Sequence, residues 1–303
     1  MIEQLLATSL PLAIVASTPL LLAVQGELIA ERSGMINLGI EGMMLTAAIS
    51  AVFAAQLSGS IAIGFLGGIA GAALIGLLFG FFAIALRADQ IVTGTAINLL
   101  ALGGTGFVYR EMEQSAIFVR SVPHLGKQSI PLLQSIPILG PLLFQADLVV
   151  TCAWVVLPIM LAIILWNSSF GLRLRACGEN PAAITANGWS VAAHRSAALA
   201  IETLLVGIAG AYLALALSSG FAENMVAGRG FIALSIVIFG RWKFKGALVG
   251  TTVFGATAAI QYAIQAMSPG FQFHLLLVLP YVVTLAVLCG LAGRVRAPQA
   301  LGR

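Results

Sequence analysis

Long runs of apolar residues, separated by short polar stretches, recur along the chain. Runs of about 18 or more apolar residues with few charges are typical of transmembrane helices. The pattern predicts about nine spans, and eight or ten also fit it. Their approximate bounds are 5–25, 35–57, 60–86, 91–109, 147–167, 193–218, 230–245, 246–267 and 273–292. The predicted fold class is therefore all-α, a single polytopic membrane-embedded helical bundle over residues 1–303.

Two of these spans have an irregular beginning or end. A Gly-bounded break at Ser33–Gly34 precedes the second span, and we expect Ser33 to cap the helix that follows. The seventh run is short and ends in RWKFK, which predicts a partial or broken helix. Both runs contain G-x-I-x-L, from Gly34 and from Gly230. Three matching positions are compatible with an inverted repeat, as in many transporters, or with coincidence.

Composition supports a membrane protein and excludes an ordinary soluble domain. Hydrophobic residues make up 60% of the 303 residues and charged residues 9%, against about 25% charged in soluble domains. The first run follows MIEQ, without the basic region or cleavage site of a signal peptide, so we expect a permanent span. The three cysteines, Cys152, Cys177 and Cys289, are widely spaced, so we expect free thiols rather than disulfides or metal ligands.

The basic residues predict which side of the membrane each loop faces. If residues 168–192 are cytoplasmic, eleven Lys and Arg residues lie inside and four outside, as the positive-inside rule requires. Those inside are Arg32, Arg87, Arg173, Arg175, Arg195, Arg241, Lys243, Lys245, Arg294, Arg296 and Arg303; those outside are Arg110, Arg120, Lys127 and Arg229. The net charge of +4 is thus an orientation signal. No nucleic-acid partner is expected.

Two further segments have a recognisable pattern. The third span has a small residue at every fourth position, which predicts a helix face for close packing; these are Gly64, Gly68, Ala72, Gly76 and Gly80. Residues 110–146 form an extracytoplasmic loop with four prolines, too many for a span. Loops of this length are often functional, so we expect a docking surface or a plain connector there.

Several polar side chains fall inside predicted spans. A charge there costs roughly 2.5–3.5 kcal/mol on insertion scales, so it usually faces a cavity or a partner. Asn37 and Glu41, four residues apart, would share one helix face. We predict a substrate pathway lined by Asn37, Glu41, Asn98, Thr95 and Glu202. The alternatives are hydrogen bonds between helices, pairing of Glu202 with Arg195, and a proton relay.

The polar stretch GLRLRACGENPAAITANGWSV separates two apolar runs. Asn180 is a good N-cap, Pro181 fits the first helical position, and Gly188 can supply a left-handed stop. A helix of about seven residues, roughly 10 Å long, results. It is too short to be stable alone, so it suits a groove on another protein or, alternatively, is a surface helix without a partner.

No motif for catalysis, metal binding or a bound cofactor is present. The chain lacks a P-loop, H-E-x-x-H and G-x-S-x-G, and its three histidines are far apart. An enzyme that hydrolyses ATP itself is therefore excluded at the level of motifs.

The same polar stretch resembles the cytoplasmic coupling loop of ATP-binding cassette importer permeases that carry branched-chain amino acids, simple sugars and nucleosides. ERSGMINLGIEGMML and GRGFIALSIVIFGRWKFKGALVG are similar to that group's other two signatures, and IPILGPLLF favours its nucleoside or simple-sugar branch. The matches run from about Gly26 to Gly250.

The resemblance implies a multi-pass inner-membrane permease subunit that carries a nucleoside or simple sugar. Its coupling helix would comprise Gly178, Glu179, Asn180, Pro181, Ala182 and Ala183. Its partners would be a separate ATPase, a second homologous permease or a second copy, and an extracytoplasmic substrate-binding protein. Two alternatives stay open: a proton-coupled secondary carrier that uses Glu41 and Glu202, and a passive channel or scaffold.

Overall fold

The structure of the protein, a computed structural model, describes residues 2–114, 123–126, 146–218, 220–267, 282 and 296–302. These residues form helices and connecting segments, without any strand in the ranges given. The helices are α1 (Ile2–Arg32), α2 (Ile40–Ser58), α3 (Ile61–Gly80), α4 (Gln90–Gln114), α5 (Leu148–Thr151), α6 (Leu157–Asn167), α7 (Ser169–Glu179), α8 (Pro181–Ala186), α9 (Val191–Tyr212), α10 (Arg229–Phe239) and α11 (Phe244–Met267). The predicted all-α class is confirmed.

Six helical stretches within the described ranges are long and apolar enough to cross a membrane. They are Leu10–Arg32, Ile40–Ser58, Ile61–Ala85, Gln90–Gln114, Leu148–Asn167 and Val191–Leu217, and they correspond to the first six predicted spans. Short π-helical turns continue α3 and α9 and join α5 to α6. The α11 helix corresponds to the eighth prediction, whereas the ninth, 273–292, lies outside the described residues apart from Val282.

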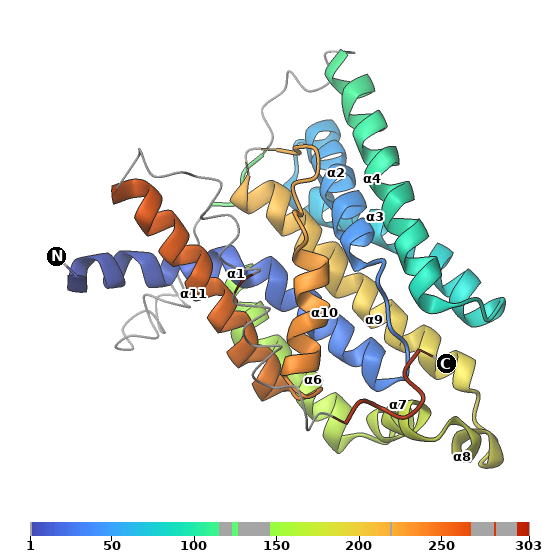
Figure 1. Cartoon of the computed structure of the whole chain (residues 1–303). Helices are drawn as coiled ribbons and strands as arrows, with labels where there is room; N and C mark the ends of the chain where they lie inside the picture. The colour runs from blue at the N-terminus through green and yellow to red at the C-terminus, as the bar shows by residue number, and fades with distance from the viewer. Residues whose placement is uncertain are drawn as a thin grey trace.

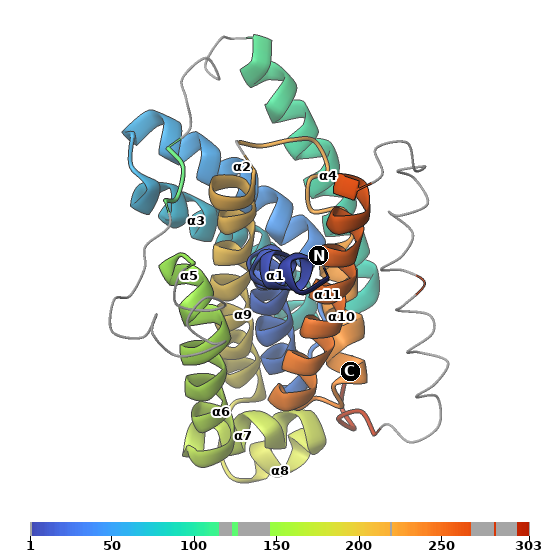
Figure 2. The same ribbon diagram turned by 90° about the vertical axis from the view of Figure 1, so that its left-hand side faces the viewer.

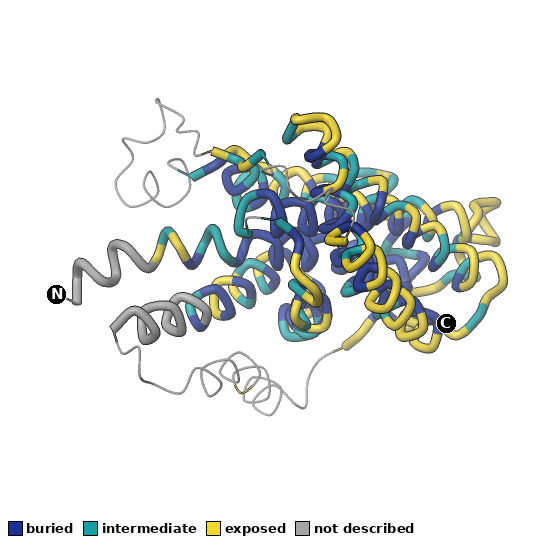
Figure 3. The backbone as a smooth tube through the Cα atoms, turned by 90° about the horizontal axis from the view of Figure 1, so that it is seen from above, coloured by how far each residue is buried: buried dark blue, intermediate teal, exposed yellow. Residues whose placement is uncertain are grey.

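At the centre of the bundle α9 packs against α1, α2 and α3, and α3 also packs against α2 (Figures 1 and 2). The membrane-crossing windows of α1 and α9 are each 78% buried, whereas that of α4 is only 28% buried. Figure 3 shows the buried residues concentrated along the middle and the exposed ones on the periphery. The α7 and α8 helices lie together at one end of the bundle (Figure 2).

The second span begins later than predicted, because residues 33–39, the α1–α2 link, are not helical. Asn37 therefore lies outside the helix, and the prediction that it shares a helix face with Glu41 is wrong. Gly34 has a φ of +89°, a conformation that interrupts a right-handed helix. The Ser33 hydroxyl donates to the carbonyl of Ala30 at 2.7 Å. It thus closes α1 instead of capping α2, a second correction.

The predicted break in the seventh run is confirmed. The α10 helix has 11 residues and ends at Phe239, and α11 starts five residues later. Arg241 and Trp242 between them both have positive φ, 53° and 52°. Such a backbone cannot continue a right-handed helix, so the chain turns there.

The glycine stripe of α3 is a packing surface, as predicted. A Cβ added to Gly68 would lie 2.8 Å from the Cβ of Ala211 on α9, and one added to Gly76 would meet Thr203 of the same helix. Real Cβ atoms do not approach so closely, so α3 and α9 could not keep this separation with larger residues.

Gly68→Leu is expected to lower the midpoint of thermal unfolding of the detergent-solubilised protein, because overpacking typically costs about 1–3 kcal/mol. Gly103→Leu on α4 is the matched control, since a Cβ there would meet no atom within 4 Å. Thermal unfolding followed by light scattering measures both shifts. Equal shifts for the two variants would contradict close α3–α9 packing.

Candidate functional site

The α1–α2 link is held by side chains from α4. The Asn98 side chain donates to the carbonyl of Leu38 at 2.6 Å and accepts from the N–H of Gly42 at 2.7 Å. Gln90 accepts from the N–H of Ile36 at 2.8 Å. Non-helical backbone at membrane depth needs such partners, because lipid offers none. Asn98 thus joins α4 to the start of α2.

A second set of buried polar groups ties the link to α1 and α9. The Asn37 side chain donates to Glu202 on α9 at 2.8 Å, and its own oxygen accepts from the N–H of Gly39. Glu27 on α1 accepts from the backbone N–H of Asn37 at 3.3 Å. Asn37, Glu27 and Glu202 are each 0% exposed. These three side chains therefore fasten the link in the centre of the bundle.

The carboxyl groups of Glu27 and Glu202 adjoin one another. One oxygen of each, Oε2, is buried and receives no hydrogen bond from any described residue. Two adjoining carboxylates repel when both are ionised.

Glu41 joins the beginnings of two helices, α2 and the shorter α10. Its two carboxylate oxygens accept from the N–H groups of Gly228 and Gly230, each at 2.7 Å. These N–H groups lie at the N-terminus of α10, where free backbone donors and the helix dipole favour a negative charge. Because Glu41 is in the first turn of α2, it fixes the beginnings of α2 and α10 together.

Thr95 differs from the other predicted pathway residues. Its side chain is exposed, and its hydroxyl donates to the carbonyls of Ile91 and Val92 in its own helix. Glu41 and Asn98 are partly exposed. The structure thus brings Asn37, Glu41, Asn98 and Glu202 to the same joint of α1, α2, α4 and α9, and leaves Thr95 on the open face of α4.

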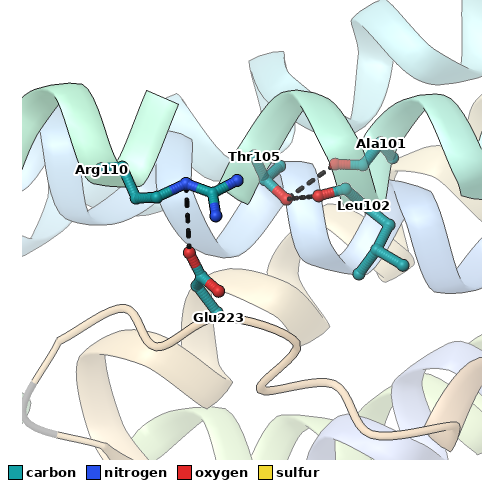
Figure 4. Close-up of polar contacts among 5 residues, drawn as sticks. All are labelled: Ala101, Leu102, Thr105, Arg110 and Glu223. Carbon is teal, nitrogen blue, oxygen red and sulfur yellow. Dashed lines mark hydrogen bonds and ion pairs between the residues drawn. The ribbon is translucent and has the colours of Figure 1, made fainter. Parts of the chain in front are cut away.

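The far end of α4 is connected to the segment after α9. Figure 4 shows Arg110 pointing toward Glu223, with 3.7 Å between Nε and the carboxylate oxygen. Both side chains are about half exposed or more, 64% and 49%, so this pair contributes little stability. One turn earlier, the Thr105 hydroxyl donates to two carbonyls of α4, those of Ala101 and Leu102.

The predicted short helix is confirmed as α8, but Gly178 and Glu179 of the expected coupling helix belong to the end of α7, because the chain bends at Asn180. Asn180 caps it by accepting from the N–H of Ala183 at 3.3 Å, Pro181 is its first residue, and Gly188 beyond it has a φ of +76°. Ile184 is buried and anchors the helix on its neighbours. Its other residues face outwards, among them Ala182, Ala183, Thr185 and Ala186. The α8 helix thus presents a small, mostly exposed surface at the end of the bundle.

Arg32, the last residue of α1, connects this end of the bundle to the α10–α11 turn. Its guanidinium donates to the carbonyl of Trp242 at 2.6 and 2.9 Å and lies over the ring of Trp166, which Arg175 also covers. The indole N–H of Trp242 donates to Glu31. The ends of α1, α6, α7 and α10 therefore meet at one cluster.

Cys177 lies beside this cluster, at the end of α7. Its thiol is buried and free, and burial raises the pKa of Cys177 although Arg195 opposes the rise. The thiol is therefore neutral at neutral pH. Cys152 is also free, as predicted, and Cys289 lies outside the described residues.

Comparison with known families decides what this bundle is. Residues 10–288 match the model of branched-chain amino acid transport system permease components. The chain belongs to this permease family. The family resemblance given by the three sequence signatures is thereby confirmed, and the permease is a multi-pass protein of the cell inner membrane.

Several relatives match the permease over most of its length. The guanosine ABC transporter permease NupQ of Bacillus subtilis is 34% identical, with 99% of this chain and 97% of the relative covered. The nucleoside ABC transporter permease NupC of Lactococcus lactis is 35% identical, with 95% and 93% covered. A putative glucose ABC transporter permease of Haloferax volcanii is 34% identical, with 84% and 76% covered. No solved structure is significantly similar to the permease.

Two buried acidic residues, one at the joint and one at the cluster with Trp242, were missing from the predicted pathway set. Glu27 and Glu31 lie inside α1 and are 0% exposed, whereas the first span was predicted to end at residue 25. Their spacing of four residues was a usable signal, because it places both on one helix face. Gln90 and Trp242 were also missed, since their partners are distant in the sequence.

Glu202→Gln is expected to leave the midpoint of thermal unfolding of the permease nearly unchanged, and Glu202→Leu to lower it. The glutamine oxygen can still accept from Asn37, whereas leucine leaves the buried amide without its acceptor, which costs about 1–3 kcal/mol. Thermal unfolding of the purified permease measures both. If the leucine variant is as stable as the glutamine variant, the Asn37–Glu202 contact does not fasten the link.

Proposed function

We propose that this permease translocates a nucleoside, with energy from ATP that a separate subunit hydrolyses. The observation that carries the proposal is the pair of nucleoside-named relatives, which match 95% or more of the chain. The glucose-named relative supports a simple sugar as the second candidate. The chain contains no P-loop of its own, which is consistent with a permease that depends on another subunit for ATP hydrolysis.

The proposed pathway runs beside the joint, between α2, α4 and α10. Glu41 and Asn98 are partly exposed there, and Thr95 is exposed on α4. These polar groups can bond to the hydroxyls and ring nitrogens of a nucleoside. Asn37 and Glu202 are fully buried, so they take part by holding the link in position.

The proposed partners are assigned to α8 and to residues 110–146, most of which lie outside the described residues. The exposed α8 docks in a groove of the ATPase subunit, on the cytoplasmic side, and residues 110–146 dock the extracytoplasmic binding protein. The second permease is either another copy or a different one. Bacillus subtilis has two named guanosine permeases that resemble this chain, NupQ and NupP, at 34% and 25% identity. They favour a pair of unlike permeases.

Reconstitution tests the proposal. The permease, co-purified with its ATPase subunit, partner permease and binding protein, is placed in liposomes, and uptake of labelled guanosine and glucose is measured with and without ATP. We expect ATP-dependent guanosine uptake that glucose does not inhibit. Uptake by the permease alone that follows a proton gradient and ignores ATP would instead indicate a secondary carrier.

A further inference from the structure

The C-terminal segment, residues 296–302, is attached to the bundle beside α7 (Figure 1). The N–H of Ala300 donates to the carbonyl of Gly178 at 2.8 Å, and the N–H of Gly302 donates to the carbonyl of Gly34 at 3.0 Å. Gly178 belongs to α7 and Gly34 to the α1–α2 link. Two backbone hydrogen bonds therefore connect residues 178–186, here called the coupling segment, to the link through the C-terminal segment.

The segment is fitted to this place by its side chains as well. Pro298 and Ala300 are buried, and Leu301 packs against the hydrophobic core. The N–H of Leu301 donates to the carbonyl of Pro298 at 3.1 Å, which closes a turn. Burial of these apolar side chains therefore stabilises the position of the segment, in addition to its two hydrogen bonds to the bundle.

Gly178 and Gly34 are in direct contact beneath the segment. A Cβ added to Gly178 would lie 2.4 Å from the carbonyl oxygen of Arg32 and 3.1 Å from the nitrogen of Gly34. A Cβ added to Gly34 would lie 3.1 Å from the carbonyl oxygen of Ala300. Backbones packed this closely move together, because there are no side chains between them to repack.

The same segment borders a cleft of about 860 Å³ next to the start of α8. Gln299, Ala300 and Gly302 line one wall, and Glu179, Asn180 and Pro181 another. A protein that docks on α8 would therefore lie beside the C-terminal segment.

We propose that residues 296–302 are a positioning element that ties the coupling segment to the α1–α2 link. Movement of α8 would then reach the beginnings of α2 and α10. This inference rests on the proposed ATP-driven function. Movement of α8 would displace Gly178, which lies against Gly34, and the bonds from Ala300 and Gly302 would keep the two glycines in this contact. The link would then shift Asn37 and the beginning of α2.

Ala300→Pro tests the tie, because proline lacks the N–H that donates to Gly178. Ala300→Ser keeps this N–H and is the matched control. In the reconstituted complex we expect Ala300→Pro to keep ATP hydrolysis and the bound ATPase subunit. Uptake should fall by about tenfold or more, within the range of coupling between two sites, so that more ATP is hydrolysed per nucleoside. Ala300→Ser should retain the wild-type ratio of nucleoside uptake to ATP hydrolysis.

A deletion of residues 298–303 provides a second variant that does not depend on tolerance of proline. It should show the same loss of uptake with ATP hydrolysis retained. An unchanged ratio of uptake to ATP hydrolysis in both variants would overturn the proposal, and so would loss of the ATPase subunit, which would make the segment a docking element. Failure of the proposed function would appear in the wild-type complex, whereas failure of this inference would appear only in the variants.

Discussion

Replacement of Glu179 and Asn180 by alanine is expected to reduce ATP-driven uptake by about tenfold or more, within the usual range of coupling between two sites. Asn180 caps α8 through Ala183, and loss of such a cap costs about 0.5–2 kcal/mol. A helix of six residues has little stability of its own. Without its cap, α8 should lose the shape that fits the ATPase subunit. Uptake and ATP hydrolysis measured on the same liposomes check this result.

A matched control is available at the other end of the bundle. Glu223→Ala with Asn224→Gly also removes one exposed carboxylate and one exposed amide, here from the segment after α9, and glycine accommodates the φ of 55° at residue 224. We expect this variant to transport as the wild type does. Normal uptake by the Glu179/Asn180 double variant, in a correctly inserted permease, would contradict the coupling role of α8.

Glu41→Leu is expected to abolish most uptake, and Glu41→Gln to weaken it several-fold. The carboxylate of Glu41 accepts from Gly228 and Gly230 at the start of α10, and hydrogen bonds to charged groups contribute about 1.5–3 kcal/mol each. Glutamine offers one acceptor oxygen and turns an N–H group toward the second donor. Leucine offers no acceptor, so α2 and α10 would separate. Initial rates of uptake in liposomes distinguish the three proteins.

The same pair of variants separates the permease mechanism from proton transport. If Glu41 carried a proton, glutamine would stop transport completely, and uptake would follow a pH gradient. If Glu41 positions α10, the glutamine variant retains part of its ATP-driven uptake. Wild-type uptake by the leucine variant would contradict both accounts. Comparison of the two variants at equal amounts of inserted permease removes differences in expression.

The sequence predicted those helices whose bounds are determined by residues close together in the chain. Hydropathy predicted the first six spans because each apolar run is continuous. The α8 helix was predicted from Asn180, Pro181 and Gly188, which determine its beginning and end within nine residues. The glycine stripe of α3 was predicted from its spacing of four.

Contacts between distant residues could not be predicted in this way. Gly228, which binds Glu41, lies 187 residues further along the chain. The start of α2 at Ile40 depends on the positive φ of Gly34 and on bonds from α1, α4 and α9 to the link. The position of Glu27 inside α1 likewise depends on Asn37 and Glu202. A hydropathy pattern carries no information about these partners, so the predicted helix boundaries differ from the observed ones by several residues.

Cross-linking from α8 in intact membranes tests the central claim most directly. A photoreactive amino acid at Thr185, which is exposed on α8, should form a covalent product with the ATPase subunit. The same group at Ser58, exposed at the other end of α2, should form none. If the product arose from Ser58, or from neither position in a complex that imports nucleoside with ATP, α8 would not be the contact that couples ATP hydrolysis to transport.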